Sequence, residues 1–362
     1  RDCTGRTALL QATLDDRVHV VKALVDTNAD ISLRNRNNHT PLMLAAEHNY
    51  LDVMQVLIAA SASVNAAEND TMSPLSVAAQ HGQVEAVHLL VAAGAELHDT
   101  PRSTSALHAA VQHGHVAVVE TLLDYNVDIN ADNDLYYRPL TQASIKGYTD
   151  IVQLLLIRKA TVDNTMPINR TELMYAATHG YLDIIHLLLN AGAAVNRQGL
   201  FGTTALAEAA EAGHVDAVRA LLAAGADREL GDKYGMTPLM SAAYSNEASC
   251  VKELLQARAN LHARDDEQRT ALISATFRDA VDCVRVLLEA RAVVDECCNK
   301  GYTAMMWAAS HGSTAALKVL LAAKARTDIV GENGTTALML AAQQDHKEVL
   351  CVLLEEAMQP ES

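Results

Sequence analysis

Apolar and polar positions follow one pattern that returns along the whole chain. Eleven six-residue blocks carry apolar residues at positions i, i+1, i+4 and i+5, as in VVKALV, IIHLLL and CVRVLL. This spacing places one broad apolar stripe on a single side of an α-helix. The third position of these blocks is usually polar, as at Lys22, Gln55, Glu120, Arg219 and Lys318. We therefore expect eleven amphipathic helices whose polar columns face solvent.

A shorter helix is expected before each of these blocks. It carries a pair of small residues, as at Ala45–Ala46 and Ala209–Ala210, and small side chains let packed helices approach closely where bulkier ones would overpack. An anchor opens each unit, in most cases Thr or Ser followed two residues later by Leu. The anchors lie 33 residues apart, with one interval of 32: Thr7, Thr40, Ser73, Ser105, Arg138, Thr171, Thr204, Thr237, Thr270, Thr303 and Thr336.

Nine residues after every anchor stands Gly, Asn or Asp. These residue types most readily adopt the left-handed conformation that ends a helix. The column comprises Asp16, Asn49, Gly82, Gly114, Gly147, Gly180, Gly213, Asn246, Asp279, Gly312 and Asp345. It predicts that each first helix ends at the same point of its unit.

These units resemble the ankyrin-repeat family, through TPLMLAAEHN, SPLSVAAQHG, SALHAAVQHG, TALAEAAEAGH and LLAAGAD. A period of 33 with two helices per unit is the spacing of that family. The resemblance implies an all-α solenoid of eleven tandem helix-turn-helix units with β-hairpin-like fingers, forming a single ankyrin-repeat domain over residues 1–362. It implies protein binding without naming the partner, because one scaffold serves many ligands.

The sequence departs from the family pattern at two columns. The His of the T-P-L-H motif remains only at His108, which leaves open the polar tie that this His normally makes. Met replaces it in five units, which we interpret as adaptable packing, at Met43, Met174, Met240, Met306 and Met339. Cations replace the Gly that follows the second helix at Lys159, Arg258, Arg291 and Lys324.

Charge and cysteine usage exclude several classes of function. A net charge of −16 argues against general affinity for nucleic acid, which needs a basic footprint. No apolar run reaches 18 residues, so we expect no membrane insertion.

Cys250 and Cys283 lie one repeat apart in the sequence. If their helices pack against each other, the two residues are roughly 8–10 Å apart, which is too far for a disulfide. The six cysteines, which include Cys3, Cys297, Cys298 and Cys351, form no disulfide or zinc pattern, so we expect reduced thiols and a cytoplasmic or nuclear protein.

We predict that the chain is not an enzyme and uses no cofactor. The P-loop, G-x-S-x-G and H-E-x-x-H motifs are absent, and the constant period leaves no insertion for a lid. A histidine column stands eight residues after the anchor, with neighbouring members about 10 Å apart, too far for a compact metal site. We interpret its members as polar groove residues: His48, His81, His113, His179 and His311. A small-molecule ligand is not expected.

The resemblance places ligand-facing residues at −4, −3, −1, +7 and +8 from each anchor, and +4 shares the helical face of +8. Basic and acidic residues are nearly equal in number in these groove columns, so the excess of negative charge lies on the other surfaces of the protein. Aromatic residues occupy the columns from the fifth to the tenth repeat, beside cations that could take a carboxylate while the rings take apolar groups. The predicted partner-binding residues are Tyr137, Tyr175, Phe201, Tyr234, Tyr244, Arg269, Phe277, Arg278, Lys300, Tyr302, Trp307 and His311.

The leading hypothesis is therefore an intracellular adaptor or scaffold that binds a protein or peptide in its concave groove. Three alternatives stay open: a mechanical or tethering array of a larger membrane or cytoskeletal protein, a host-directed effector, and a substrate for asparagine hydroxylation. The last rests on turn residues Asn65, Asn130 and Asn196, which resemble those hydroxylated in some ankyrin repeats. The first residue is Arg rather than Met, and the sequence leaves open whether the chain is a piece of a longer protein.

Overall fold

A computed structural model describes residues 7–66, 72–97, 105–132, 137–164 and 169–358. The chain divides into two compact units, residues 1–167 and 168–362, and each is treated separately below. Whether the whole chain behaves as one uninterrupted domain stays a prediction.

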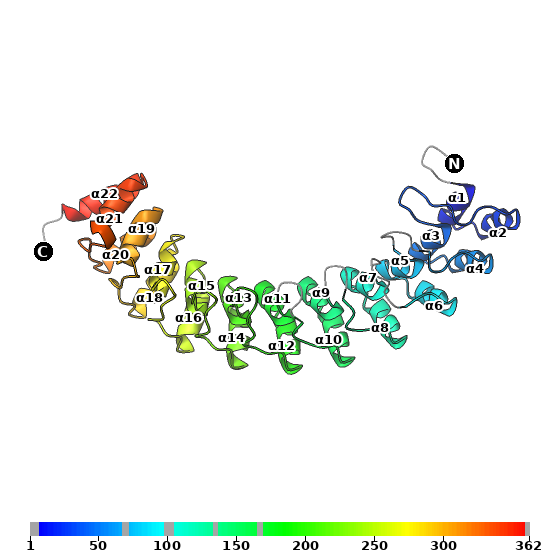
Figure 1. The fold of residues 1–362 in the computed structure, drawn as a ribbon, viewed down its shortest axis with the longest axis horizontal. Coiled ribbons are helices and arrows are strands. Elements are labelled where there is room, and N and C mark those ends of the chain that lie inside the picture. The colour runs from blue at the N-terminus through cyan, green and yellow to red at the C-terminus, as the bar shows by residue number, and fades with distance from the viewer. Residues whose placement is uncertain (1–6, 67–71, 98–104, 133–136, 165–168, 359–362) are drawn as a thin grey trace. The chain divides into compact units, whose positions relative to one another are not determined.

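Helices occur in pairs along both units, one pair for each predicted repeat (Figure 1). The first unit contains α1 (Ala8–Leu14) and α2 (Val18–Asp26), α3 (Pro41–Glu47) and α4 (Leu51–Ala59), α5 (Pro74–Gln80) and α6 (Val84–Ala92), α7 (Ala106–His113) and α8 (Val116–Asp124), and α9 (Pro139–Lys146) and α10 (Thr149–Ile157). The second contains α11 (Glu172–His179) and α12 (Leu182–Asn190), α13 (Ala205–Glu211) and α14 (Val215–Ala223), α15 (Pro238–Tyr244) and α16 (Ala248–Gln256), α17 (Ala271–Thr276) and α18 (Val281–Glu289), α19 (Ala304–His311) and α20 (Thr314–Ala322), and, after the short 3₁₀ turn η1 (Glu332–Gly334), α21 (Ala337–Gln343) and α22 (Lys347–Ala357).

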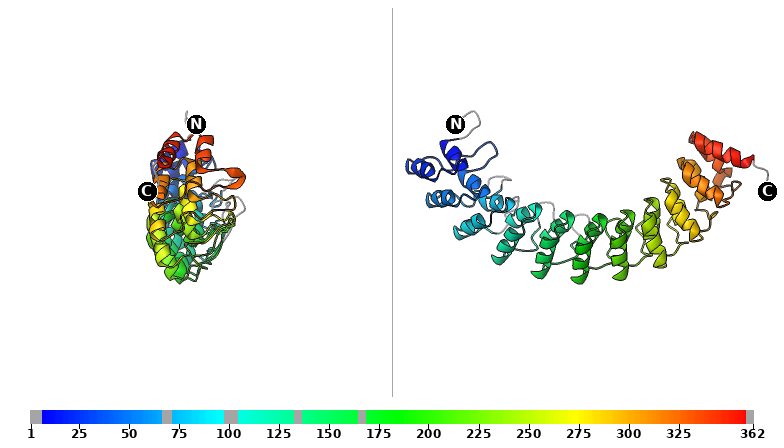
Figure 2. Two further views of the ribbon diagram at one scale, coloured as in Figure 1. Left: turned by 90° about the vertical axis from the view of Figure 1, so that its left-hand side faces the viewer. Right: turned by 180° about the vertical axis from the view of Figure 1, so that it is seen from behind.

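The two helices of each pair belong to two parallel rows within a unit. In the second unit α11, α13 and α15 lie side by side, and α12, α14 and α16 form the other row, as Figure 2 also shows from behind. We call the odd-numbered helices inner helices and the even-numbered ones outer helices. The predicted all-α ankyrin-type repeat fold is confirmed.

Local sequence signals fix where each inner helix starts and stops. The anchor hydroxyl accepts a hydrogen bond from the backbone N–H three residues on, as from Met43 to Thr40 at 3.3 Å, in every repeat except that of Arg138. All eleven residues nine positions past the anchor have positive φ, from 51° at Asp16 to 79° at Gly114 and Gly213. The predicted helix ends are therefore confirmed.

The connections between repeats form short fingers that pair with one another in the second unit. Each finger closes on itself, as where the Asp232 N–H donates to the Met236 carbonyl at 3.0 Å. Neighbouring finger tips are then joined by backbone hydrogen bonds, which hold five successive fingers in register: Lys233 N–H to Phe201 O at 2.8 Å, Asp266 to Tyr234 at 3.0 Å, Asn299 to Glu267 at 3.0 Å and Glu332 to Lys300 at 2.9 Å.

The polar tie left open by the loss of histidine is present where His108 remains. His108 is buried, its Nδ1 lies 3.0 Å from the Ser105 hydroxyl, and its Nε2–H donates to the Tyr137 carbonyl at 3.0 Å. Methionine can replace only the accepting nitrogen of the histidine ring, because a thioether sulfur accepts a hydrogen bond but cannot donate one. The sulfur of Met43 accepts from the Thr40 N–H at 3.4 Å. Four of the five methionines are buried, as expected for packing, whereas Met339 is 57% exposed, so the packing interpretation is wrong there.

Candidate partner-binding surface

A cluster of aromatic rings lies on the inner-helix side of the eighth to tenth repeats. The ring centroids of Phe277 and Trp307 are 4.8 Å apart, and Phe277 lies 6.2 Å from Tyr244 and 4.8 Å from His311. Tyr302 adds an edge contact to Trp307 at 5.8 Å. These separations are those of favourable aromatic pairs. We call these five residues the aromatic cluster; His311 is exposed and the other four are half-buried.

The cations beside the aromatic cluster are not equivalent. The Arg278 guanidinium lies 4.7 Å from the Tyr244 ring centroid, is exposed, and makes no ion pair within the described residues. Arg269 lies 5.6 Å from the Phe277 centroid, but its Nε donates to the buried Asp265 carboxylate at 2.6 Å. Its predicted availability for a partner's carboxylate is therefore wrong. Lys300 is exposed, as predicted.

Trp307 is held in place by its neighbours more firmly than an exposed ring would be. It contacts Phe277, Tyr302 and His311, and its indole N–H is buried with no hydrogen-bond partner among the described residues. A buried N–H without an acceptor costs about 1–3 kcal/mol. The ring thus has a structural role in the cluster in addition to any contact with a partner.

A cleft lies on the same side of the second unit, at the sixth to eighth repeats. Leu200 and Phe201 project from the seventh finger with 61% and 54% of their surface exposed, and as neighbours they form one exposed apolar patch. The cleft has a volume of about 770 Å³. Its lining, which we call the Phe201 cleft, is formed by Arg170, Thr178, Leu200, Phe201, Thr203, Glu208, Glu211, Ala212 and Ser245.

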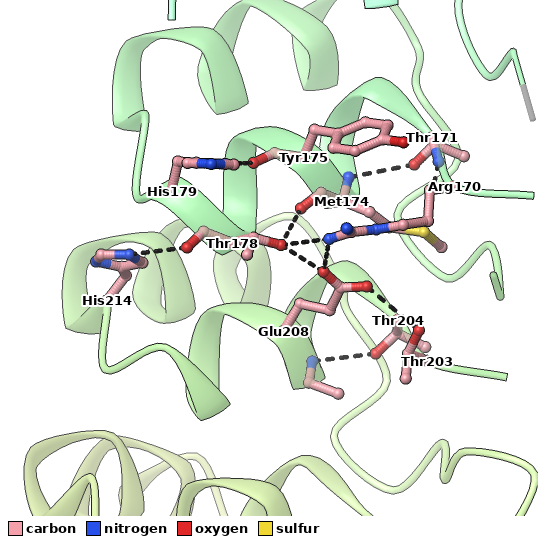
Figure 3. A network of polar contacts seen from close by, with 11 residues as sticks. Arg170, Thr171, Met174, Tyr175, Thr178, His179, Thr203, Thr204, Glu208 and His214 are labelled. Carbon is pink, nitrogen blue, oxygen red and sulfur yellow. Dashed lines mark hydrogen bonds and ion pairs between the residues drawn. The ribbon is translucent and has the colours of Figure 1, made fainter. Parts of the chain in front are cut away.

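A polar network from three segments lines one wall of the Phe201 cleft (Figure 3). The Glu208 carboxylate on α13 accepts from the Arg170 guanidinium and from the Thr178 hydroxyl, and the Thr203 hydroxyl donates to it at 3.3 Å. Arg170 also donates to Thr178 at 2.6 Å. The charge of Glu208 is therefore compensated within the protein.

The finger that follows the Phe201 finger carries a cation. The Lys233 ammonium lies 4.3 Å from the Phe201 ring centroid and 4.8 Å from that of Tyr234, which is 55% exposed. Both distances are within the range of cation–π attraction. The predicted exposure of Phe201 and Tyr234 is confirmed, while their joint contact with one lysine was not predicted.

The columns predicted to face a ligand contain every residue that lines the cleft. Most of these lining residues were nevertheless absent from the predicted partner-binding residues. Every lining residue stands at −4, −3, −1, +4, +7 or +8 from its anchor. The prediction selected rings and nearby cations, so it kept Phe201 and omitted Leu200, Glu208 and Glu211. A large apolar residue at −4, directly before an aromatic one, was the available signal.

One predicted ring lies elsewhere than expected, and another belongs to the first unit. Tyr175 on α11 is only 6% exposed, with the Arg170 guanidinium 4.5 Å from its ring centroid, so the expectation that this ring faces solvent is wrong. Tyr137 is half-buried and belongs to the first unit, where its carbonyl receives the His108 bond.

Three of the five histidines at +8 bond to the backbone of their own helices. Nδ1 of His81, His179 and His311 donates to the carbonyl four residues earlier at 2.9–3.0 Å. A second histidine column, at +10, was not predicted and links repeats: Nε2 donates to a carbonyl of the preceding repeat, in the pairs His115–Gln80, His214–Thr178 and His346–Ser310. These histidines stabilise the stack.

The buried thiols are poor nucleophiles. Cys250 and Cys283 are free and fully buried, and burial raises the pKa of Cys250 to about 11 and that of Cys283 to about 12. Cys297 and Cys351 are free and exposed, and Cys298 is free and buried. Cys3 lies outside the described residues.

The three turn asparagines bind the following repeat. Their side-chain oxygens accept backbone N–H groups at 2.7–2.9 Å, in the pairs Asn65–Glu96, Asn130–Thr161 and Asn196–Asp227. Each asparagine thus has a structural role, and its hydroxylation stays a prediction.

Stacked helix pairs with linked fingers, carrying rings on the inner-helix side, define a helical-repeat binding protein. The chain belongs to the ankyrin-repeat family: the family model for ankyrin repeats (3 copies) matches residues 1–68, 75–167, 128–199, 173–265, 227–296, 250–330 and 293–362. Ankyrin repeats are in general non-enzymatic modules of protein–protein interaction.

Among solved structures, the chain is similar to the human ASB11 ankyrin repeat domain. The two share 28% sequence identity with a TM-score of 0.57, over 61% of this chain and 99% of that one. In the part of the chain that the structure describes, no helix is long and apolar enough to cross a membrane.

Proposed function

We propose that this chain is a non-catalytic adaptor or scaffold that binds a partner protein or peptide on the inner-helix side of its second unit. The binding surface comprises the aromatic cluster and the Phe201 cleft. We confine it to the sixth to tenth repeats, because Tyr137 belongs to the first unit. We further propose a cytosolic or nuclear location, since the described cysteines are free thiols.

One observation carries this proposal: five rings from three successive repeats contact one another on one face. Aromatic residues in such clusters lose little conformational freedom on binding and dominate binding energies at interfaces. The exposed Leu200, Phe201 and Tyr234 extend the same face with apolar surface that the chain itself leaves uncovered.

The test removes exposed members of this face and spares the packed ones. The variant combines Phe201→Ala, Tyr234→Ala, Arg278→Ala and His311→Ala, all at exposed positions, so the fold is expected to persist. Partners captured with the wild-type chain are identified, purified and titrated by calorimetry. We expect the variant to bind at least thirtyfold more weakly, since central interface residues contribute about 2 kcal/mol or more.

A matched variant carries Lys252→Ala, Arg285→Ala and Lys318→Ala on the exposed side of outer helices α16, α18 and α20. It should bind as the wild type does, with equal circular dichroism in all three proteins. Full binding by the first variant, or loss only in the outer-helix variant, would contradict the proposal.

A further inference from the structure

The Phe201 cleft combines an apolar wall with one uncompensated carboxylate. Its apolar side is formed by Leu200 and Phe201, both more than half exposed. Its polar wall contains Glu208, whose carboxylate is already bound by Arg170, Thr178 and Thr203 (Figure 3). Because Glu208 is already paired with Arg170, this carboxylate is expected to contribute little to the binding of a ligand.

Glu211 is different, although it lies one helical turn beyond Glu208 and on the same side of α13. Within the described residues its carboxylate makes no hydrogen bond and no ion pair, and it lines the same cleft. Partial desolvation and then the Glu208 carboxylate raise the pKa of Glu211; Arg278 lowers it less strongly. The carboxylate thus sits where an added positive charge would be favourable.

The apolar wall suits an aliphatic stem. The Lys233 ammonium already lies 4.3 Å from the Phe201 ring centroid, so this ring offers a ligand apolar surface rather than a site for a further cation. Lysine and arginine both combine a long aliphatic stem with a charged head, and both lay that stem along apolar surface while the head stays polar.

We propose that the Phe201 cleft binds a lysine or arginine side chain of a partner segment, with its stem against Leu200 and Phe201 and its charged head at Glu211. This inference rests on the proposed function and specifies the chemistry of the partner. An acidic or phosphorylated side chain is disfavoured by the unpaired Glu211 carboxylate. A purely apolar side chain would desolvate Glu211 without compensating it.

The experiment uses displayed octapeptides with one fixed central residue, Arg, Lys, Leu, Gln or Glu, and random flanks. Selection on the purified whole chain should enrich the Arg and Lys libraries, and the two arms show which head group is preferred. A selected basic peptide, synthesised and titrated, should bind Glu211→Gln about three- to tenfold more weakly, the range of a partly exposed ion pair. Glu211→Lys should shift enrichment to the Glu-centred library.

Glu289→Gln provides the matched control, because Glu289 is an exposed glutamate at the end of outer helix α18. It should leave the affinity unchanged. Since Glu211 has no partner within the described residues, Glu211→Gln should unfold at the same temperature as the wild type, which circular dichroism checks.

The outcomes separate this inference from the proposed function. Enriched peptides that lack Lys and Arg, or basic peptides whose affinity is the same on Glu211→Gln, overturn the cleft assignment. If those peptides still lose affinity on Arg278→Ala and His311→Ala, the proposed function stands. If no library is enriched and capture of partners is independent of the inner-helix face, both proposals are overturned.

Discussion

Two glutamates on one helix show how far the partners of a residue determine its role. Glu208 and Glu211 are both on α13, yet Glu208 is bound by three side chains and Glu211 by none within the described residues. The sequence assigns both to groove columns and distinguishes them no further. The difference comes from Arg170 and Thr178, which belong to the preceding repeat. A satisfied carboxylate fixes the fold, and an unsatisfied one is available to a ligand.

This difference predicts how binding of a basic peptide depends on pH. The pKa of Glu211 is raised above its usual 4.5, and only the ionised carboxylate attracts a cation. As pH falls through this raised pKa the carboxylate is protonated, so affinity should be full at neutral pH and decline at a higher pH than for an ordinary glutamate. The total loss should level off at about three- to tenfold, as for Glu211→Gln, because protonation removes the same charge.

Titration of the selected basic peptide between pH 7.5 and 4.5 measures this decline. Glu211→Gln should show a much flatter profile. The other charged groups near Glu211 are Glu208, Asp232, Arg278 and Arg170, of which Glu208 and Arg170 form an ion pair with each other. Identical slopes in wild type and variant would assign the pH dependence to one of these groups or to the peptide.

At the scale of helices and fingers, the parts predicted well from the sequence are those fixed by local geometry. Thr40 caps its helix and Asp16 takes a left-handed conformation because neighbouring backbone alone demands it. Side-chain exposure was predicted less well, since it depends on contacts between repeats. Tyr175 occupies a ligand-facing column but is covered by Arg170, and Glu208 pairs with a residue 38 positions away. No local pattern encodes these contacts.

Gly202 tests how closely the fingers must approach. It has φ of +76°, and a Cβ there would lie 2.7 Å from the Lys233 backbone N, which bonds to the Phe201 carbonyl. Gly202→Ala should therefore separate the two fingers as well as strain its own backbone. Gly225 has φ of +86° but open space around its Cβ, so Gly225→Ala carries the strain alone, about 1–2 kcal/mol.

Thermal unfolding followed by circular dichroism compares the two glycine variants. Gly202→Ala should unfold at the lower temperature, by an additional amount equivalent to about 1–3 kcal/mol of overpacking. It should also weaken binding of the basic peptide, since Phe201 lies beside it, whereas Gly225→Ala should not. Equal unfolding temperatures of the two variants would contradict this prediction, because they would show that the two fingers can move apart without loss of stability.

For the molecule as a whole, stability is expected to come from contacts between adjacent repeats. Within each unit, inner helices pack on neighbouring inner helices and outer helices on outer helices, and the described residues of a unit form no central core shared by distant repeats. The stability of such arrays is approximately the sum of repeat and nearest-neighbour contributions. A partner that spans the sixth to tenth repeats would therefore stabilise those repeats most, because binding to the native state adds its free energy where the contacts form.

Leu254→Ala tests this locality. Leu254 is fully buried in α16, so its truncation should cost about 2–5 kcal/mol. Because α16 packs against α14 and α18, hydrogen–deuterium exchange should accelerate in these three helices, while α2 and α4 of the first unit keep their protection. A matched Lys252→Ala on the exposed side of α16 should change neither. Uniform acceleration along the chain would contradict nearest-neighbour stabilisation and would indicate that the repeats unfold as one cooperative unit.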